Sequence, residues 1–141
     1  MIGIIVTGHG HFATGLLSSI EVIAGKQDYI EAIDFHANSS NTELANSLEE
    51  AIGRLNCSDI LFCTDIAGGT PFNQSVILST RMPNSKVISG TNVPVLLEAL
   101  FSRGNQTATS MAEILVDSYQ SRIQVFQSRV DKLHNQGEDN D

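Results

Sequence analysis

The sequence predicts an α/β fold: a doubly wound, mostly parallel sheet with strand order 2-1-3-4 and helices on both faces. Two observations lead to this prediction. Short β-branched apolar runs alternate along the 141 residues with longer segments whose apolar residues recur at helical spacing. The runs are also apolar enough to be strands buried on both faces, which is typical of parallel sheets. Strands that alternate with helices favour right-handed crossovers within one such sheet.

The first strand and helix are predicted from residues 2–7 (IGIIVT) and from the segment that starts at Phe12. Residues 8–10 (GHG) break the strand, because glycine on both sides of His9 disfavours extended structure. Gly25 ends the helix. The apolar face of this helix consists of Leu16, Leu17, Ile20, Ile23 and Ala24.

Residues 29–35 are the second predicted strand. Ser40 and Glu43 then have the spacing of a capping box, which predicts the start of a second helix. Its apolar face consists of Leu44, Leu48, Ala51, Ile52 and Leu55.

The third strand is predicted over residues 59–64 (DILFCT), followed by a flexible loop over residues 65–69. Thr70 is the predicted N-cap of the third helix, with Pro71 at its first helical position. We expect this helix to run to about Arg81, because Pro83 cannot continue it.

The remaining elements are a short fourth strand over residues 86–89, a loop over residues 90–94 and a helix over residues 95–101. Apolar residues from Met111 onward keep helical spacing, which predicts a last helix to about Gln120. Residues 122–127 fit either a continued helix or an additional antiparallel strand, because their apolar residues also alternate.

Composition and charge bound the function. The chain is one domain in length, and we place that domain at residues 1–134, followed by an acidic tail at 135–141 that we expect to be disordered. A net charge of −8 argues against nucleic-acid or anionic-membrane binding. With no leader segment, no apolar run long enough to cross a bilayer and two cysteines outside any CxxC pattern, we expect a cytoplasmic protein with reduced thiols.

The predicted topology places a ligand site before any chemistry is considered. In doubly wound sheets, ligands bind at the carboxyl ends of the strands where the strand order reverses, here between strands one and three. His9 and His11 follow the first strand, and Asp65 with residues 68–70 follows the third. The two loops should therefore face each other.

These residue types suit phosphoryl transfer through a phosphohistidine. A neutral imidazole is a good nucleophile when one ring nitrogen is free and the other is held, and Asp65 is placed to hold His9. The helix that starts after residues 68–71 (GGTP) offers free backbone N–H groups, which suit an anionic group even in an acidic protein. No metal or organic cofactor is required for this chemistry.

Three segments, residues 4–10 (IIVTGHG), 61–73 (LFCTDIAGGTPFN) and 87–94 (VISGTNVP), resemble the enzyme IIA domain of the mannose-type sugar phosphotransferase system (PTS). The resemblance runs in register from Met1 to about Leu100. It implies that His9 is phosphorylated, that Asp65 hydrogen-bonds His9, and that the Thr70 hydroxyl and nearby backbone groups contact the phosphoryl group. We assign those backbone contacts to Gly69, Phe72 and Gly10.

The resemblance also implies partners. Members of the family accept the phosphoryl group from phospho-HPr and pass it to a histidine of enzyme IIB, which phosphorylates a sugar entering through membrane components IIC and IID. They commonly form homodimers by exchanging a C-terminal strand, and residues 122–127 lie where that strand would be. The overall pattern leans toward the N-acetylgalactosamine or galactosamine branch.

Two departures from the family pattern affect these expectations. Ala67 stands where some mannose-specific members have a bulky aromatic residue, which predicts a more open rim. Some members continue through an Ala/Pro linker into a fused IIB domain, whereas this sequence ends in acidic residues, so we expect IIB on a separate chain. Phe12 and Phe72 fit either a docking surface or the core.

Functions of other classes are also compatible with parts of the pattern. A small cobaltochelatase-like enzyme that binds a metal or tetrapyrrole would use His9 as a metal ligand, but it would leave residues 68–71 unexplained. A receiver-like signalling module would need an acidic cluster where this sequence has residues 7–9 (TGH). A P-loop NTPase is excluded because the Gly-Lys-Ser/Thr signature is missing.

Overall fold

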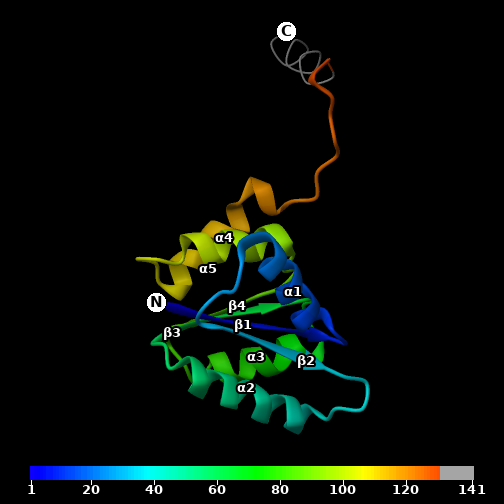
Figure 1. The fold of residues 1–141 in the computed structure, drawn as a ribbon. Helices are drawn as coiled ribbons and strands as arrows, with labels where there is room; N and C mark the ends of the chain where they lie inside the picture. Colours follow the sequence, from blue (N-terminus) through cyan, green and yellow to red (C-terminus); the bar gives the residue numbers. More distant parts are fainter. Residues whose placement is uncertain (131–141) are drawn as a thin grey trace.

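The computed structural model, which describes residues 1–130, contains a four-stranded sheet with every pair of neighbouring strands parallel (Figure 1). The strands are β1 (Ile2–His9), β2 (Ile30–Phe35), β3 (Asp59–Thr64) and β4 (Ser85–Ile88). Their order across the sheet is β2-β1-β3-β4, which confirms the predicted fold class and strand order. The helices are α1 (Phe12–Ala24), α2 (Asn41–Leu55), α3 (Thr70–Ser79), α4 (Val93–Ser102) and α5 (Ala108–Asp117).

Helices cover both faces of the sheet, with α1, α4 and α5 on one face and α2 and α3 on the other (Figure 1). Strand β1 supplies both hydrophobic cores, because successive side chains point to opposite faces. Ile4 and Val6 pack under α1 and α4, whereas Ile5 packs against α2. Residues 2–8 are all buried, which explains why this strand is apolar almost throughout.

Local signals in the sequence set most of the helix ends. Ser40 caps α2 by accepting a hydrogen bond from the Glu43 N–H, and Gly25 ends α1 with a φ of 82°. The prediction for α3 was wrong by one residue: Gly69 is the N-cap, so Thr70 lies in the first turn. The Thr70 side chain therefore makes no cap hydrogen bond, and α3 ends at Ser79, two residues before the predicted end at Arg81.

Arg103 lies at the opposite end of the sheet from His9 and is buried, with 6% of its surface exposed. Its guanidinium donates hydrogen bonds to the backbone carbonyls of Ile2, Asp28 and Tyr29. The side chain ties the end of α4 to the start of β1 and to the residues before β2.

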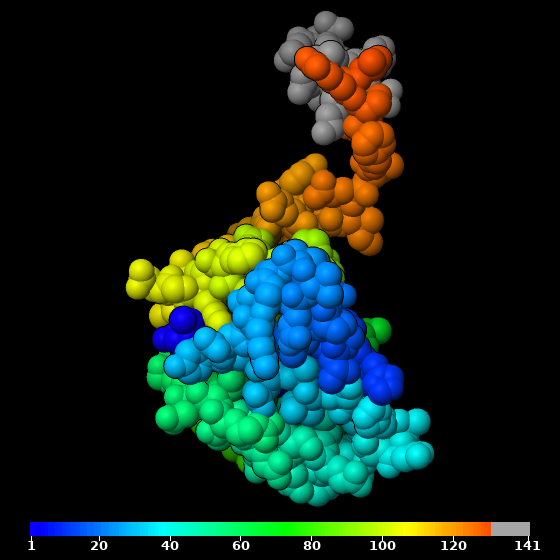
Figure 2. Space-filling view, viewed as in Figure 1, coloured from blue at the N-terminus to red at the C-terminus, as the bar shows by residue number. Residues whose placement is uncertain are grey.

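After α5, the chain forms one turn of 3-10 helix at Tyr119–Ser121, and residues 122–128 are neither helix nor strand. This segment extends away from the rest of the domain (orange in Figures 1 and 2). The additional antiparallel strand that the sequence allows is not formed within residues 1–130 of a single chain. The predicted tail, residues 135–141, and the end of the predicted domain lie outside the described residues.

Candidate functional site

His9 is the last residue of β1, where the strand pairs with the end of β2. The strand is two residues longer than predicted, because Gly8 and His9 continue the register with Asp34 and Phe35. Gly10 then turns the chain with a φ of 60°, a conformation that glycine adopts without strain. Its N–H donates to the Phe35 carbonyl at 2.7 Å, so the backbone is paired with β2 both before and after His9.

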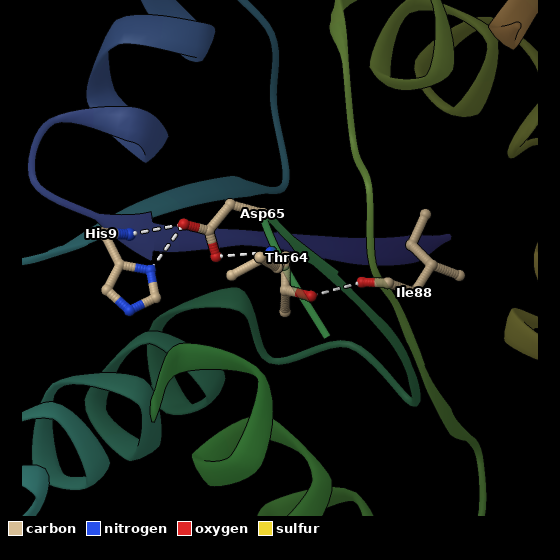
Figure 3. A network of polar contacts seen from close by, with 5 residues as sticks. His9, Thr64, Asp65 and Ile88 are labelled. Carbon is tan, nitrogen blue, oxygen red and sulfur yellow. Dashed lines mark hydrogen bonds and ion pairs between the residues drawn. The ribbon is translucent and has the colours of Figure 1, made fainter. Parts of the chain in front are cut away.

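Asp65 follows β3 directly and lies against His9, as the sequence predicted for the two loops (Figure 3). Its Oδ2 accepts hydrogen bonds from the His9 backbone N–H at 2.9 Å and from the ring Nδ1 at 2.8 Å. Its Oδ1 accepts from the Ile66 N–H at 2.8 Å. Burial raises the pKa of the Asp65 carboxyl, but the hydrogen bonds from His9 and Ile66 outweigh this effect and hold the pKa below its usual value.

The Asp65 contact determines which ring nitrogen of His9 is free. An ionised carboxylate can only accept hydrogen bonds, so Nδ1 carries a proton, and in the neutral imidazole the lone pair is therefore on Nε2. The His9 side chain is 48% exposed, whereas the Asp65 side chain is only 16% exposed. The arrangement therefore gives a held, partly exposed imidazole with one unprotonated nitrogen.

Two glycines allow the loops to approach this closely. A Cβ at Gly69 would lie 2.6 Å from His9 Cε1 and 3.3 Å from Nε2. A Cβ at Gly8 would lie 2.4 Å from Phe12 Cδ1 and 2.9 Å from Asp65 Cγ. A side chain at Gly69 would displace His9, and a side chain at Gly8 would displace Phe12 and Asp65.

The N-terminus of α3 lies next to the imidazole through Gly69. Among the described residues, the backbone N–H groups of Thr70 and Phe72 and the Thr70 hydroxyl have no hydrogen-bond partner. The Gly69 N–H contacts the Ile66 carbonyl at 3.4 Å, and the Gly10 N–H is used by Phe35. Fewer backbone N–H groups are therefore free than the sequence suggested. The free ones lie at the positive end of a helix dipole.

Two further residues around His9, Phe35 and Asp34, were not found from the sequence. The Phe35 ring meets the His9 ring edge to face, with centroids 5.9 Å apart. Asp34, at the end of β2, caps α1 by accepting from Thr14 N at 3.0 Å and Thr14 Oγ1 at 2.6 Å. His11 pairs with Asp34 at 3.4 Å, so it does not share the Asp65 contact of His9. Strand register brings these groups together, and a single sequence carries no signal for it.

Both phenylalanines near the site are partly buried. Phe12 packs against the core at the start of α1, and Phe72 is half-buried at the start of α3.

Cys57 and Cys63 are free thiols, and burial raises the pKa of Cys63 to about 12. Within residues 1–130, no group of three or more His, Cys, Asp or Glu side chains could hold a metal ion. None of the helices in that range is both long and apolar enough to span a membrane.

Comparison with known proteins identifies the family of the chain. Residues 3–116 match the model of a family described as the PTS system fructose IIA component. The chain belongs to this family. It is a phosphoryl carrier of a sugar phosphotransferase system, and EIIA domains work in a phosphotransfer chain with other components of that system. The cobaltochelatase-like alternative is not supported.

Two named relatives show how the EIIA match extends along the chain. The fructose-specific EIIA component of Bacillus subtilis is 27% identical over 140 residues, which cover 99% of this chain and 96% of that protein. The mannose-specific EIIAB component of Escherichia coli is 31% identical over 103 residues, which cover 72% of this chain but only 32% of that protein. The relatives therefore support the mannose-type family, and the amino-sugar branch stays a prediction.

Solved structures of EIIA proteins share the fold. The EIIA component of Streptococcus agalactiae superposes with a TM-score of 0.77 at 38% identity, over 82% of this chain and 90% of that one. The mannose/sorbose-specific IIA subunit of Enterococcus faecalis superposes with a TM-score of 0.80 at 22% identity, over 89% of this chain and 95% of that one. The second likeness is one of fold alone.

Proposed function

We propose that this EIIA domain carries the phosphoryl group on Nε2 of His9. The observation that supports this most is the hydrogen bond between His9 Nδ1 and Asp65, which leaves the Nε2 lone pair free. Nε2 also lies beside Gly69, at the N-terminus of α3, where unpaired donors are available for an anionic group.

The transfer step needs no proton movement at His9. The Nε2 lone pair forms a new N–P bond while the donor imidazole nitrogen takes back the electron pair of the N–P bond that breaks. Nδ1 keeps its proton and continues to donate to Asp65, whose negative charge stabilises the positive charge that develops on the ring. The protein thus supplies alignment and charge stabilisation.

The phosphoryl oxygens are held by donors at the start of α3. These donors are the N–H groups of Thr70 and Phe72 and the Thr70 hydroxyl, which is free because Gly69 is the N-cap. Gly69 and Gly10 contribute through their backbone shape: Gly69 leaves room for the ring, and Gly10 turns the chain after His9. Backbone donors explain how a chain with a net charge of −8 holds a dianionic group.

The partners follow from the same site. The donor is phospho-HPr and the acceptor is a histidine of enzyme IIB, which serves the membrane components IIC and IID, and the reactions take place in the cytoplasm. The 48% exposure of the His9 side chain supports access by two proteins in turn. The exposed Ile66, in the loop after β3 that also contains Asp65 and Gly69, offers an apolar contact for both.

The C-terminal segment supports a homodimer. Ile123, Val125 and Phe126 are at least 82% exposed, which is unusual for apolar side chains in a monomer. Strand β4 is an edge of the sheet, and a groove lined in part by Val87, Ala112 and Val116 runs beside it. In the dimer, residues 122–127 of one subunit form the additional strand beside β4 of the other subunit.

Light scattering should give a dimer for the wild-type chain and a monomer for Ile123→Glu/Phe126→Glu. A monomeric wild type contradicts this arrangement.

The central test is phosphorylation by phosphoenolpyruvate, enzyme I and HPr. One phosphoryl group should be added, and it should be acid-labile and base-stable, as expected of phosphohistidine. His9→Ala should abolish labelling, whereas His11→Ala, two residues away, should keep it. Labelling that survives His9→Ala would overturn the proposal, and coupling of phosphorus to Nδ1 instead of Nε2 in ¹⁵N-labelled protein would overturn the assignment of the nitrogen.

A further inference from the structure

We infer that Phe35 is a positioning residue for the reaction: its aromatic ring holds the His9 imidazole in the orientation that presents Nε2 to a partner. The inference rests on the proposed function of His9. Phe35 does not contact the phosphoryl group in this proposal. It acts through the imidazole.

Backbone pairing fixes Phe35 relative to His9. The two residues are direct register partners at the ends of β2 and β1, and their side chains therefore leave the same face of the sheet. The hydrogen bond from the Gly10 N–H to the Phe35 carbonyl locks this pair at the point where the strands end. Small shifts of one strand end would move both rings together.

The Phe35 ring is also anchored on its far side. It is partly buried and packs against the hydrophobic core beneath α2, which includes Ile5 and Leu44. Packing therefore fixes the position of the ring, unlike that of an exposed aromatic side chain, which changes rotamer freely.

His9 needs this contact with Phe35 because its hydrogen bond to Asp65 does not fix the ring plane by itself. Small changes of the His9 side-chain torsions can keep the Nδ1 hydrogen bond, and Nε2 would then move through a range of positions. The edge-to-face contact, with an interplanar angle of 74°, restricts this movement from the Phe35 side, while Gly69 lies against the Cε1 and Nε2 edge. Misplacement of a nucleophile by a fraction of its contact distance slows transfer strongly.

An aromatic residue suits this position better than an aliphatic one. A flat ring with a positive edge and negative face gives orientation-dependent contacts with imidazole, which are worth more than the buried area alone. Leucine and methionine have similar apolar volume but no such directional contact. Replacing Phe35 with leucine or methionine therefore keeps the apolar packing but removes the contact that orients the His9 ring.

The test compares Phe35→Leu, Phe35→Met and Phe35→Tyr in single-turnover transfer from phospho-HPr, with Ile33→Val as a matched control. Ile33 lies two residues earlier on the same face of β2 and packs against the same core. We expect the maximal rate to fall about 3- to 10-fold for the Leu and Met variants at an unchanged half-saturating HPr concentration. Phe35→Tyr and Ile33→Val should transfer within about twofold of wild type, and thermal melting identifies the folded variants.

Each other outcome overturns the inference. Wild-type rates in folded Leu or Met variants would show that the aromatic ring is not needed. An equal loss in Ile33→Val would show that core packing, and not ring orientation, sets the rate. A changed half-saturation with an unchanged maximal rate would assign Phe35 to partner binding. None of these results bears on the proposed function, which is tested separately by the labelling of His9→Ala and by the nitrogen to which phosphorus couples.

Discussion

One oxygen of Asp65, Oδ2, binds both the backbone and the side chain of His9: it accepts from the His9 N–H at 2.9 Å and from Nδ1 at 2.8 Å. The carboxylate therefore positions the strand end and the ring at once. This double contact joins the carboxyl ends of β1 and β3, where the topology places the site.

Asp65→Asn should slow phosphoryl transfer about tenfold while leaving the fold intact. The amide oxygen can still accept from Nδ1, but the charge-assisted part of the bond, on the order of 1.4 kcal/mol, is lost. Single-turnover transfer from phospho-HPr measures the rate. Asp59→Asn is a matched control, because Asp59 begins β3 and accepts from the Ala108 N–H at 2.8 Å. An unchanged rate for Asp65→Asn, or an equal loss for Asp59→Asn, contradicts the role of Asp65.

Gly69→Ala should abolish most of the transfer by displacing the imidazole. The new Cβ would lie 2.6 Å from His9 Cε1, too close for any real contact, so the ring must rotate away. We expect a rate loss of at least about 100-fold. Gly15→Ala in α1 is the control, since its Cβ meets no atom within 4 Å and should stabilise the helix by about 0.5–1 kcal/mol. A Gly69→Ala variant with normal transfer would show that the close approach of loop and ring is not needed.

The sequence was sufficient to predict the strand order and the meeting of His9 with Asp65. Both follow from local patterns, because apolar periodicity identifies the strands and parallel topology brings their carboxyl ends together. The sequence was not sufficient for the end of β1, since pairing with β2 extends it through His9. It also placed the N-cap at Thr70, because a threonine before a proline is a good local cap, whereas tertiary structure selects Gly69.

The residues that the sequence did not reveal act between elements distant along the chain. Asp34 caps a helix that begins 22 positions before it, and Phe35 meets His9 only because the strands pair in one register. His11, the N-cap residue of α1, makes no side-chain cap hydrogen bond, and the local sequence does not indicate that Asp34 supplies one. A single sequence shows local preferences, whereas these contacts depend on the assembled sheet.

Asp34 should stabilise the fold near neutral pH and lose this effect in acid. Burial raises its pKa, but hydrogen bonds from Thr14 and the contact with His11 outweigh burial and lower the pKa below its usual value. A carboxyl with a lowered pKa in the folded state stabilises above its unfolded pKa, about 3.9, and the contribution disappears as the pH falls through the folded pKa. Urea unfolding should show Asp34→Asn about 1–2 kcal/mol less stable at pH 7, with the gap narrowing below about pH 4. A gap that does not depend on pH would contradict this account.

Arg103→Met should destabilise the domain without affecting phosphoryl transfer. The substitution keeps much of the apolar side chain but removes the hydrogen bonds to the carbonyls of Ile2, Asp28 and Tyr29. The Tyr29 carbonyl still accepts from the Ile4 N–H, so the largest loss is at the buried end of β1. We expect a cost of about 2–4 kcal/mol, because hydrogen bonds from a charged donor are strong and a buried carbonyl is left unpaired.

Arg54→Met is the matched control for Arg103. Arg54 forms an ion pair with Glu31 on the surface, where its side chain is 53% exposed, so its loss should cost no more than about 1 kcal/mol. Urea denaturation at pH 7 measures both variants, and single-turnover transfer below their unfolding transitions measures function. Because Arg103 lies at the amino end of β1 and His9 at its carboxyl end, the rate should stay at the wild-type value. Equal stability of the two variants would show that the buried guanidinium contributes no more than a surface ion pair.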